Sequence, residues 1–307
     1  MREEHFCAHI SEVRQDPFIG LATPADLWLM VEYTGPWEYM SVYNNKLPEH
    51  VREWLKAIAN DYMNLKTIVT FIRKDMRPLG RIRCFVGVTR EEREAIYAFN
   101  FASYEEIPKL DLEALRTGSP EYDAYLSSDP MYLVCTNGKH DMCCARFGIP
   151  VHREASRIDS EHTWHCTHIG WDQFAANFLC LPHGVYYSRV TVPEVASIIE
   201  ADRARRLYTR KCRGRTIYSY AVQAAEHYIR EHTGETRMDA LRLLDSTTEA
   251  EGRDTVRFQA TSDGTIYRVT IQFELQQPEM PPCRCDAEGK NLRYHFHLQT
   301  FEELQPA

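Results

Sequence analysis

Residues 131–148, MYLVCTNGKHDMCCARFG, join an apolar run to a cysteine-rich loop. The first six residues are mostly apolar and predict a buried strand that runs into Cys135. Cys143 and Cys144 follow within ten positions, with glycine, lysine, histidine and aspartate in between. A polar, glycine-bearing turn is an unusual place for thiols that merely fill a core. The stretch therefore predicts a functional site at the end of a strand in an α/β fold.

A second loop has the same design. In WHCTHIGWDQFAANF (residues 164–178), a strand expected over 163–169 carries Cys166 and His168 and is followed by a turn and an apolar segment over 171–181, helical or extended. If the two strands are neighbours in one sheet, both loops emerge at the same edge and their thiols and imidazole meet. Thiolates and imidazoles are ligands that suit iron–sulfur clusters or zinc.

The composition narrows the class of protein. The chain has 307 residues, of which 44% are hydrophobic and 26% charged, as in ordinary globular proteins with one large or two smaller domains. The net charge of -8 gives no basic excess, so no nucleic-acid partner is expected. The sequence has no run of about 18 apolar residues, so we expect no membrane span. Its N-terminus has no apolar run, so we expect no signal peptide. We therefore expect a cytoplasmic protein whose 10 cysteines are thiols or metal ligands.

Hydrophobic periodicity divides the chain into three parts, 1–125, 126–214 and 215–307. The first part reads strand, helix, strand, strand, strand, followed by a polar connector over 103–129 with one short helix. Its expected elements are 27–33, 47–62, 66–74, 81–89 and 94–101.

The second part repeats this theme. A helix is expected over 144–158, interrupted at Gly148 and Pro150, and another over 191–206 with Thr191 as its cap. Further strands are expected at 131–136 and 184–190. The third part contains a helix over 218–234, a hairpin around Asp263-Gly264 and a strand within NLRYHFHLQTF.

The remaining cysteines and histidines have weaker signals. Cys84 and Cys180 lie in apolar strands and are interpreted as core residues, whereas the sequence is silent on Cys7 and Cys212. The C-x-C pair Cys283 and Cys285 is a weak candidate for a second metal or redox site. His140 and His165 are interpreted as surface or packing residues, and His183 as a weak candidate near the loops.

Four blocks, in order, resemble the sucrase/ferredoxin-like family, whose metal domain is similar to thioredoxin-like [2Fe–2S] ferredoxins. They run from about residue 27 to 226 and are WLMVEYTGPWE, YLVCTNGKHDMCCARFG, WHCTHIGWDQFAANFLCLPHGVYYSRV and YSYAVQAAE. The resemblance implies a [2Fe–2S] electron-transfer domain with mixed cysteine and histidine ligands. In the family the first two ligands are cysteines separated by eight residues. This spacing matches Cys135 and Cys144 and leaves Cys143 as a bystander.

The second ligand pair departs from the family pattern. The family word resembles S/T-H-I-G-G-H, in which both histidines bind iron, and His168 matches the first of them. The second position is Asp172, and Trp171 replaces a glycine. The position in the family pattern favours Asp172 as the fourth ligand, whereas ligand chemistry favours Cys166. Cys143 is the third candidate for this ligand. Loss of the cluster, with the fold kept as a scaffold, is a further alternative.

The resemblance predicts two thioredoxin-like α/β halves, the first without ligands, followed by a C-terminal helix-plus-hairpin extension of α+β type. A histidine ligand would raise the reduction potential above that of all-cysteine ferredoxins. Near the cluster, Lys139, Arg146 and Arg189 could supply positive charge to the cofactor or dock an acidic redox partner protein, which the sequence does not name. The sequence leaves open whether the chain forms a homodimer.

Three functions compete at this point. The first is an electron carrier, or the iron–sulfur part of a larger oxidoreductase. The second is a thiol–disulfide redox protein that uses Cys135 with Cys143 or Cys144, and the third is a structural zinc module with an interaction role. No carboxylate pair stands in a convincing context for glycoside hydrolysis, so hydrolase activity is discounted.

Overall fold

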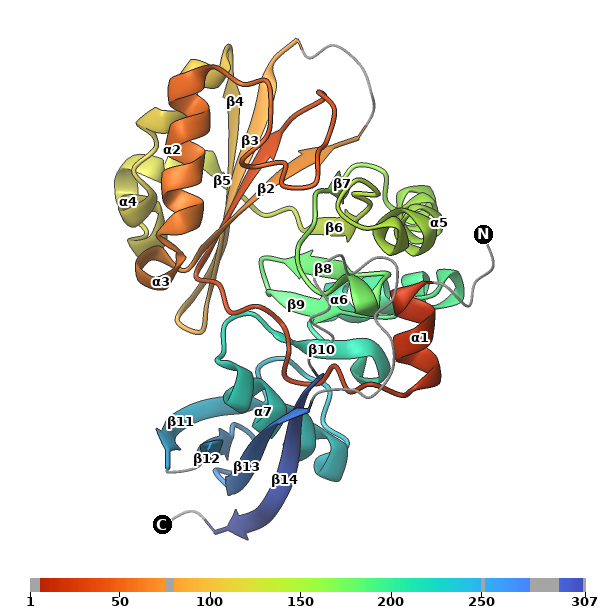
Figure 1. The fold of residues 1–307 in the computed structure, drawn as a ribbon. Coiled ribbons are helices and arrows are strands. Elements are labelled where there is room, and N and C mark those ends of the chain that lie inside the picture. Colours follow the sequence, from red (N-terminus) through yellow and green to blue (C-terminus); the bar gives the residue numbers. More distant parts are fainter. Residues whose placement is uncertain (1–5, 75–79, 250–251, 277–292, 306–307) are drawn as a thin grey trace.

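The computed structural model describes residues 6–74, 80–249, 252–276 and 293–305. The chain forms a ten-stranded mixed sheet flanked by helices and a separate four-stranded antiparallel sheet (Figure 1). The predicted α/β class is therefore confirmed. Within these residues, no helix has the length and apolar character needed to cross a membrane.

The first half of the large sheet has a parallel pair of strands where it borders the second half. β1 is parallel to β2 and antiparallel to β3, and β4 pairs with β3. The elements, with η for 3-10 helices, are α1 (Cys7–Val13), β1 (Leu27–Glu32), α2 (Glu49–Asn60), α3 (Tyr62–Leu65), β2 (Thr67–Arg73), β3 (Ile82–Arg90), β4 (Arg93–Phe101), η2 (Tyr104–Lys109), α4 (Leu112–Thr117), η3 (Pro120–Tyr125) and β5 (Leu126–Ser127).

The connector over 103–129 contains more helix than the single short helix expected. Ser103 and Glu106 form a capping box at η2, and the Asp111 side chain accepts a hydrogen bond from the backbone of Ala114 at the start of α4. Such caps satisfy the first N–H groups of a helix, so short helices form in a polar segment.

The second half repeats the arrangement of the first. β6 is parallel to β7 and antiparallel to β8, and β9 pairs with β8, so the order β7-β6-β8-β9 mirrors β2-β1-β3-β4. The elements are β6 (Met131–Cys135), α5 (Met142–Ile158), β7 (Thr163–Cys166), η4 (Asp172–Phe174), β8 (Phe178–Leu181), β9 (Val185–Tyr187), η5 (Val192–Glu194), α6 (Val195–Arg203), η6 (Thr209–Lys211) and β10 (Cys212–Arg215).

The two halves are joined by antiparallel pairing of β2 with β7, and they share one core. Trp28 and Met30 of β1 pack in the same apolar cluster as Leu133 of β6. The rings of Phe85 and Trp164, one from each half, lie 5.5 Å apart. Alternate residues of a strand face opposite sides of a sheet. On the side away from the shared core, each half therefore has a core of its own, the first beneath α2 and α4 and the second beneath α5 and α6.

The third part forms the separate sheet, with α7 packed on it and against β10. The hairpin predicted around Asp263-Gly264 is confirmed, as are the C-cap at Gly234 and the final strand. The elements are α7 (Tyr220–Thr233), β11 (Leu241–Thr248), β12 (Arg253–Ala260), β13 (Ile266–Gln276) and β14 (Arg293–Leu304). Cys283 and Cys285 lie outside the described residues, so nothing tests their pairing.

The predicted interruption of the helix over 144–158 is wrong. α5 runs through both Gly148 and Pro150. A Cβ built on Gly148 would lie 2.0 Å from the carbonyl oxygen of Cys135, so this glycine allows α5 to pack closely against the end of β6. Packing of α5 against β6, β7 and α6 offsets the hydrogen bond that the exposed Pro150 cannot donate.

Candidate metal centre

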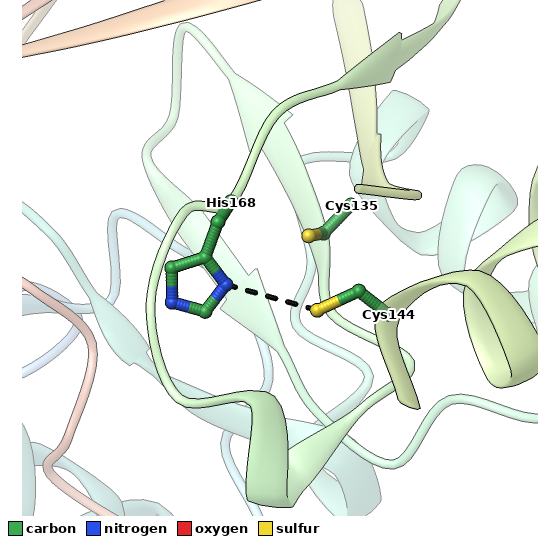
Figure 2. A group of neighbouring side chains, drawn as sticks. All are labelled: Cys135, Cys144 and His168. Atoms are coloured by element: carbon green, nitrogen blue, oxygen red, sulfur yellow. Dashed lines mark hydrogen bonds between the residues drawn. The ribbon is translucent and has the colours of Figure 1, made fainter. Parts of the chain in front are cut away.

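Cys135, Cys144 and His168 converge at one edge of the large sheet (Figure 2). Cys135 ends β6, Cys144 lies in the first turn of α5, and His168 follows β7. One ligand atom from each lies within 4.8 Å of the other two, and the Cys144 Sγ is 3.7 Å from His168 Nδ1. The expectation that β6 and β7 are neighbours, with both loops at one edge, is confirmed.

Local hydrogen bonds explain how the first loop brings both cysteines to this edge. The Asn137 side chain accepts hydrogen bonds from the backbone of Lys139 and His140, which closes the turn after β6. Asp141 then caps α5 by accepting a hydrogen bond of 2.6 Å from the backbone N–H of Cys143. The turn and the cap together set the spacing between Cys135 and Cys144.

The paired thiols have opposite pKa shifts. A hydrogen bond from the Cys144 thiol lowers the pKa of Cys135 well below its usual value, helped by His168 and opposed by burial. The hydrogen bond to Cys135 and burial raise the pKa of Cys144 well above its usual value. The pair therefore favours one thiolate on Cys135 and one thiol on Cys144, and a metal ion would displace the remaining proton.

A second group of ligand atoms shares His168. Atoms of His140, His168 and Asp172 also lie within 4.8 Å of one another, and the imidazole rings of His140 and His168 stack at 3.5 Å. His140 Nδ1 lies 2.8 Å from the carbonyl oxygen of Tyr39, which can only accept, so Nδ1 carries the proton and Nε2 keeps its lone pair. Burial, and then the charge of Asp141, raise the pKa of Asp172.

The other predicted site residues lie around this centre. Cys166 pairs in register with Cys135 and is fully buried in the same core cluster. Among the described residues, it joins no group of three ligand atoms within 4.8 Å. Burial, and then the charge of Cys135, raise the pKa of Cys166 well above its usual value. Lys139 and Arg146 are exposed, in the turn after β6 and in α5.

Two residues near the centre were missed by the sequence analysis. His140 was interpreted as a surface or packing residue, and the sequence was silent on Cys7. The Cys7 sulfur lies 3.2 Å from that of Cys143 and 3.6 Å from Asp172 Oδ2. The position of His140 inside the cysteine loop was a usable signal, whereas Cys7 precedes Cys143 by 136 residues.

The donor set fits a thiophilic metal or an iron–sulfur cluster. Two thiols and an imidazole point to one place, and a half-buried carboxylate and a second imidazole lie beside them. Thiolate and imidazole ligands suit zinc and iron–sulfur chemistry, whereas magnesium and calcium prefer oxygen ligands. The arrangement therefore selects for soft or borderline metals.

Fold and site together define an α/β protein with a cysteine–histidine group of the kind that binds such metals. In a comparison with protein families, the sucrase/ferredoxin-like model matches residues 18–214. The chain belongs to the sucrase/ferredoxin-like family, as the sequence blocks predicted. A search of curated proteins gave no match, and a search of solved structures gave none either.

Proposed function

We propose that this protein transfers electrons through a [2Fe–2S] cluster bound by Cys135, Cys144 and His168. The observation that carries the proposal is the convergence of these three ligand atoms, two of them from thiols in the core that the two halves share. Membership of a family with ferredoxin in its name supports a redox role. When bound, such a cluster accepts and releases one electron at a time.

Each ligand residue would give the proposed cluster a different property. Cys135 offers a thiolate, because hydrogen bonds from Cys144 and His168 lower its pKa. His168 is a neutral ligand, and replacing a thiolate with imidazole removes negative charge and raises the reduction potential. The half-buried position of His168 leaves its ring nearer to solvent than the two buried thiols. Electron and proton uptake are coupled at such a histidine.

For the fourth position we propose Asp172. Its carboxylate groups with His168 in space, and in the family pattern it replaces the second histidine. Cys166 is the better ligand by chemistry, but its thiol belongs to no such group within the described residues. His140 is the third contender, because its ring stacks on His168.

The absorption spectrum of the purified full chain tests the cluster. A brown protein with visible charge-transfer bands and about two irons and two sulfides per chain is expected. A colourless protein with zinc held by Cys135, Cys144 and His168 would instead make this centre a structural zinc module.

Neighbouring cysteines provide matched variants for the ligand assignment. Cys135→Ala and Cys144→Ala should abolish the visible bands, whereas Cys143→Ala should keep them. Loss of the bands in Cys143→Ala with retention in Cys144→Ala contradicts the assignment. Asp172→Ala and Cys166→Ala, compared by electron paramagnetic resonance of the reduced protein, test the fourth ligand, because loss of a ligand changes the g-values more than loss of a neighbouring side chain.

Lys139 and Arg146 are proposed to dock an acidic redox partner protein. Both side chains are exposed and lie on the two segments that carry the ligand cysteines. Complementary charge speeds association at low salt. Charge reversal at both positions should slow electron transfer to an acidic acceptor at low salt and leave the spectrum unchanged. An equal rate in the variant refutes this role.

The proximity of two thiols favours a second candidate function, thiol–disulfide exchange at Cys135 and Cys144, whose sulfurs lie within 4.8 Å of each other. A thiolate with a lowered pKa beside a second thiol is typical of reactive cysteine pairs. A metal-free protein in which iodoacetamide modifies Cys135 at neutral pH, and oxidation links Cys135 to Cys144, would favour this function over the cluster.

A further inference from the structure

A second group of thiols and carboxylates lies beside the candidate metal centre and plays no part in it. One ligand atom each from Cys7, Asp141 and Cys143 lies within 4.8 Å of the other two. All three residues are at least nine-tenths buried. Cys7 comes from the N-terminal helix α1, whereas Asp141 and Cys143 begin α5, so the group joins two segments far apart in sequence.

The distances within this group lie within about 0.6 Å of the edges of a tetrahedron around a zinc ion. With zinc–sulfur bonds of about 2.3 Å and zinc–oxygen bonds of about 2.0 Å, those edges are about 3.8 Å between two sulfurs and about 3.5 Å between sulfur and oxygen. The sulfurs of Cys7 and Cys143 are 3.2 Å apart. Cys7 Sγ lies 4.0 Å from Asp141 Oδ1 and 3.6 Å from Asp172 Oδ2.

The surroundings of this group are apolar. Cys7 and Cys143 belong to a small buried cluster with Phe6, Ala8 and Ala175, and the Phe6 ring packs edge-on against Phe147. Ionised thiols and carboxylates are costly to bury in such a place unless a cation compensates their charge. Asp141 still caps α5 while it serves as a ligand, because a carboxylate has about four lone-pair sites.

We propose that Cys7, Asp141 and Cys143 bind a zinc ion that fastens α1 to the start of α5. On binding, the two thiols release their protons to solvent and form zinc–sulfur bonds, and no electron is transferred. Asp172 borders the fourth position. Because Asp172 also groups with His168, a single carboxylate lies between the two metal sites.

The site has a structural consequence for the candidate metal centre. α1 packs against η4, the segment that begins at Asp172. Zinc at Cys7 and Cys143 therefore fixes the N-terminal helix over the loop that follows His168 and over the turn that carries Cys144. The site rests on its own distances and does not depend on the proposed cluster.

Metal analysis of the full chain tests the proposal. The protein is purified with reductant, and zinc is measured by mass spectrometry, with cobalt(II) added to zinc-depleted protein as a spectroscopic probe. About one zinc per chain and thiolate-to-cobalt charge-transfer bands are expected. Cys7→Ala and Cys143→Ala should each lose the zinc, whereas Cys84→Ala, an equally buried thiol in another core, should keep it.

The variant Cys135→Ala separates this site from the cluster. Zinc retained in Cys135→Ala and lost in Cys7→Ala supports the proposal whether or not a cluster is present. Zinc lost in Cys135→Ala and retained in Cys7→Ala would place it in the candidate metal centre and overturn the proposal. A reduced wild-type chain that binds no zinc or cobalt overturns it as well.

Thermal unfolding gives a readout that does not depend on metal counts. A zinc chelator should lower the Tm of the wild-type chain and of Cys84→Ala but leave the Tm of Cys7→Ala unchanged, because only an intact site has zinc to lose. Equal effects of the chelator on Cys7→Ala and the wild type contradict the site.

Discussion

Replacement of Gly148 by alanine tests how the fold brings the two ligand cysteines together. The new Cβ would lie 2.0 Å from the carbonyl oxygen of Cys135 and 3.2 Å from its carbonyl carbon. Contacts of a Cβ below 3.0 Å are essentially never seen, so α5 must move away from β6 by about 1 Å. Both contacting groups are backbone, and no side chain can rotate to relieve the clash.

The size of the effect follows from two opposing contributions. Overpacking of a tight contact costs about 1–3 kcal/mol, and the upper end applies because backbone meets backbone. The better helix propensity of alanine offsets about 1 kcal/mol of this cost. We therefore expect Gly148→Ala to lower the free energy of unfolding by about 2 kcal/mol.

Urea denaturation of Gly148→Ala and of the wild type measures this difference. Gly80→Ala is the matched control, because a Cβ at Gly80 would meet nothing within 4 Å. Movement of α5 carries Cys144 away from Cys135, so bound metal or iron should fall in Gly148→Ala and not in the control. A Gly148→Ala protein as stable as the wild type, or more stable, would refute the reasoning.

Two further predictions concern the ion pairs of Arg215 with Glu226 of α7 and with Glu94 of β4. Glu226 lies 2.8 Å from Arg230 and 3.4 Å from Arg215, so Glu226→Ala should destabilise the chain by about 3–5 kcal/mol in urea denaturation, and a loss below about 1 kcal/mol contradicts this. Burial opposes the ionisation of Glu94, but a hydrogen bond and charge from His183, followed by the charges of Arg215 and Arg205, lower its pKa from 4.5 to about 2. Because the folded-state pKa is lowered, Glu94 contributes about 3 kcal/mol above pH 4.5, and this contribution is lost as pH falls towards 2. Stability measured against pH should therefore fall less steeply below pH 4.5 in Glu94→Gln than in the wild type, and parallel curves would refute the role of Glu94.

Local sequence patterns predicted most secondary-structure elements. The strands at 27–33 and 66–74 and the helix at 47–62 differ from β1, β2 and α2 by at most two residues at either end. Their hydrophobic periodicity arises because one face of a helix or sheet is buried, and this pattern is visible among residues that are close in sequence. The prediction that Gly148 interrupts the helix failed because glycine is required there for the close approach of α5 to β6. Local sequence does not show which residues must approach a distant element closely.

The segment over 171–181 shows a different limit. It was left open between a short helix and an extended run, and the structure divides it into η4 and β8. An apolar run fits either conformation, and pairing of β8 with β6 and β9 decides in favour of a strand at its end.

The sequence by itself determined the α/β class, the family and the two loops that hold Cys135, Cys144 and His168, because strand patterns and motif spacing are local properties. Only the tertiary structure decided what lies around these loops. It placed His140 against His168, and it brought Cys7 to Cys143 across 136 residues. Contacts of this range follow from how α1 and α5 pack on the second half of the sheet, and nothing in the spacing of single residues specifies them.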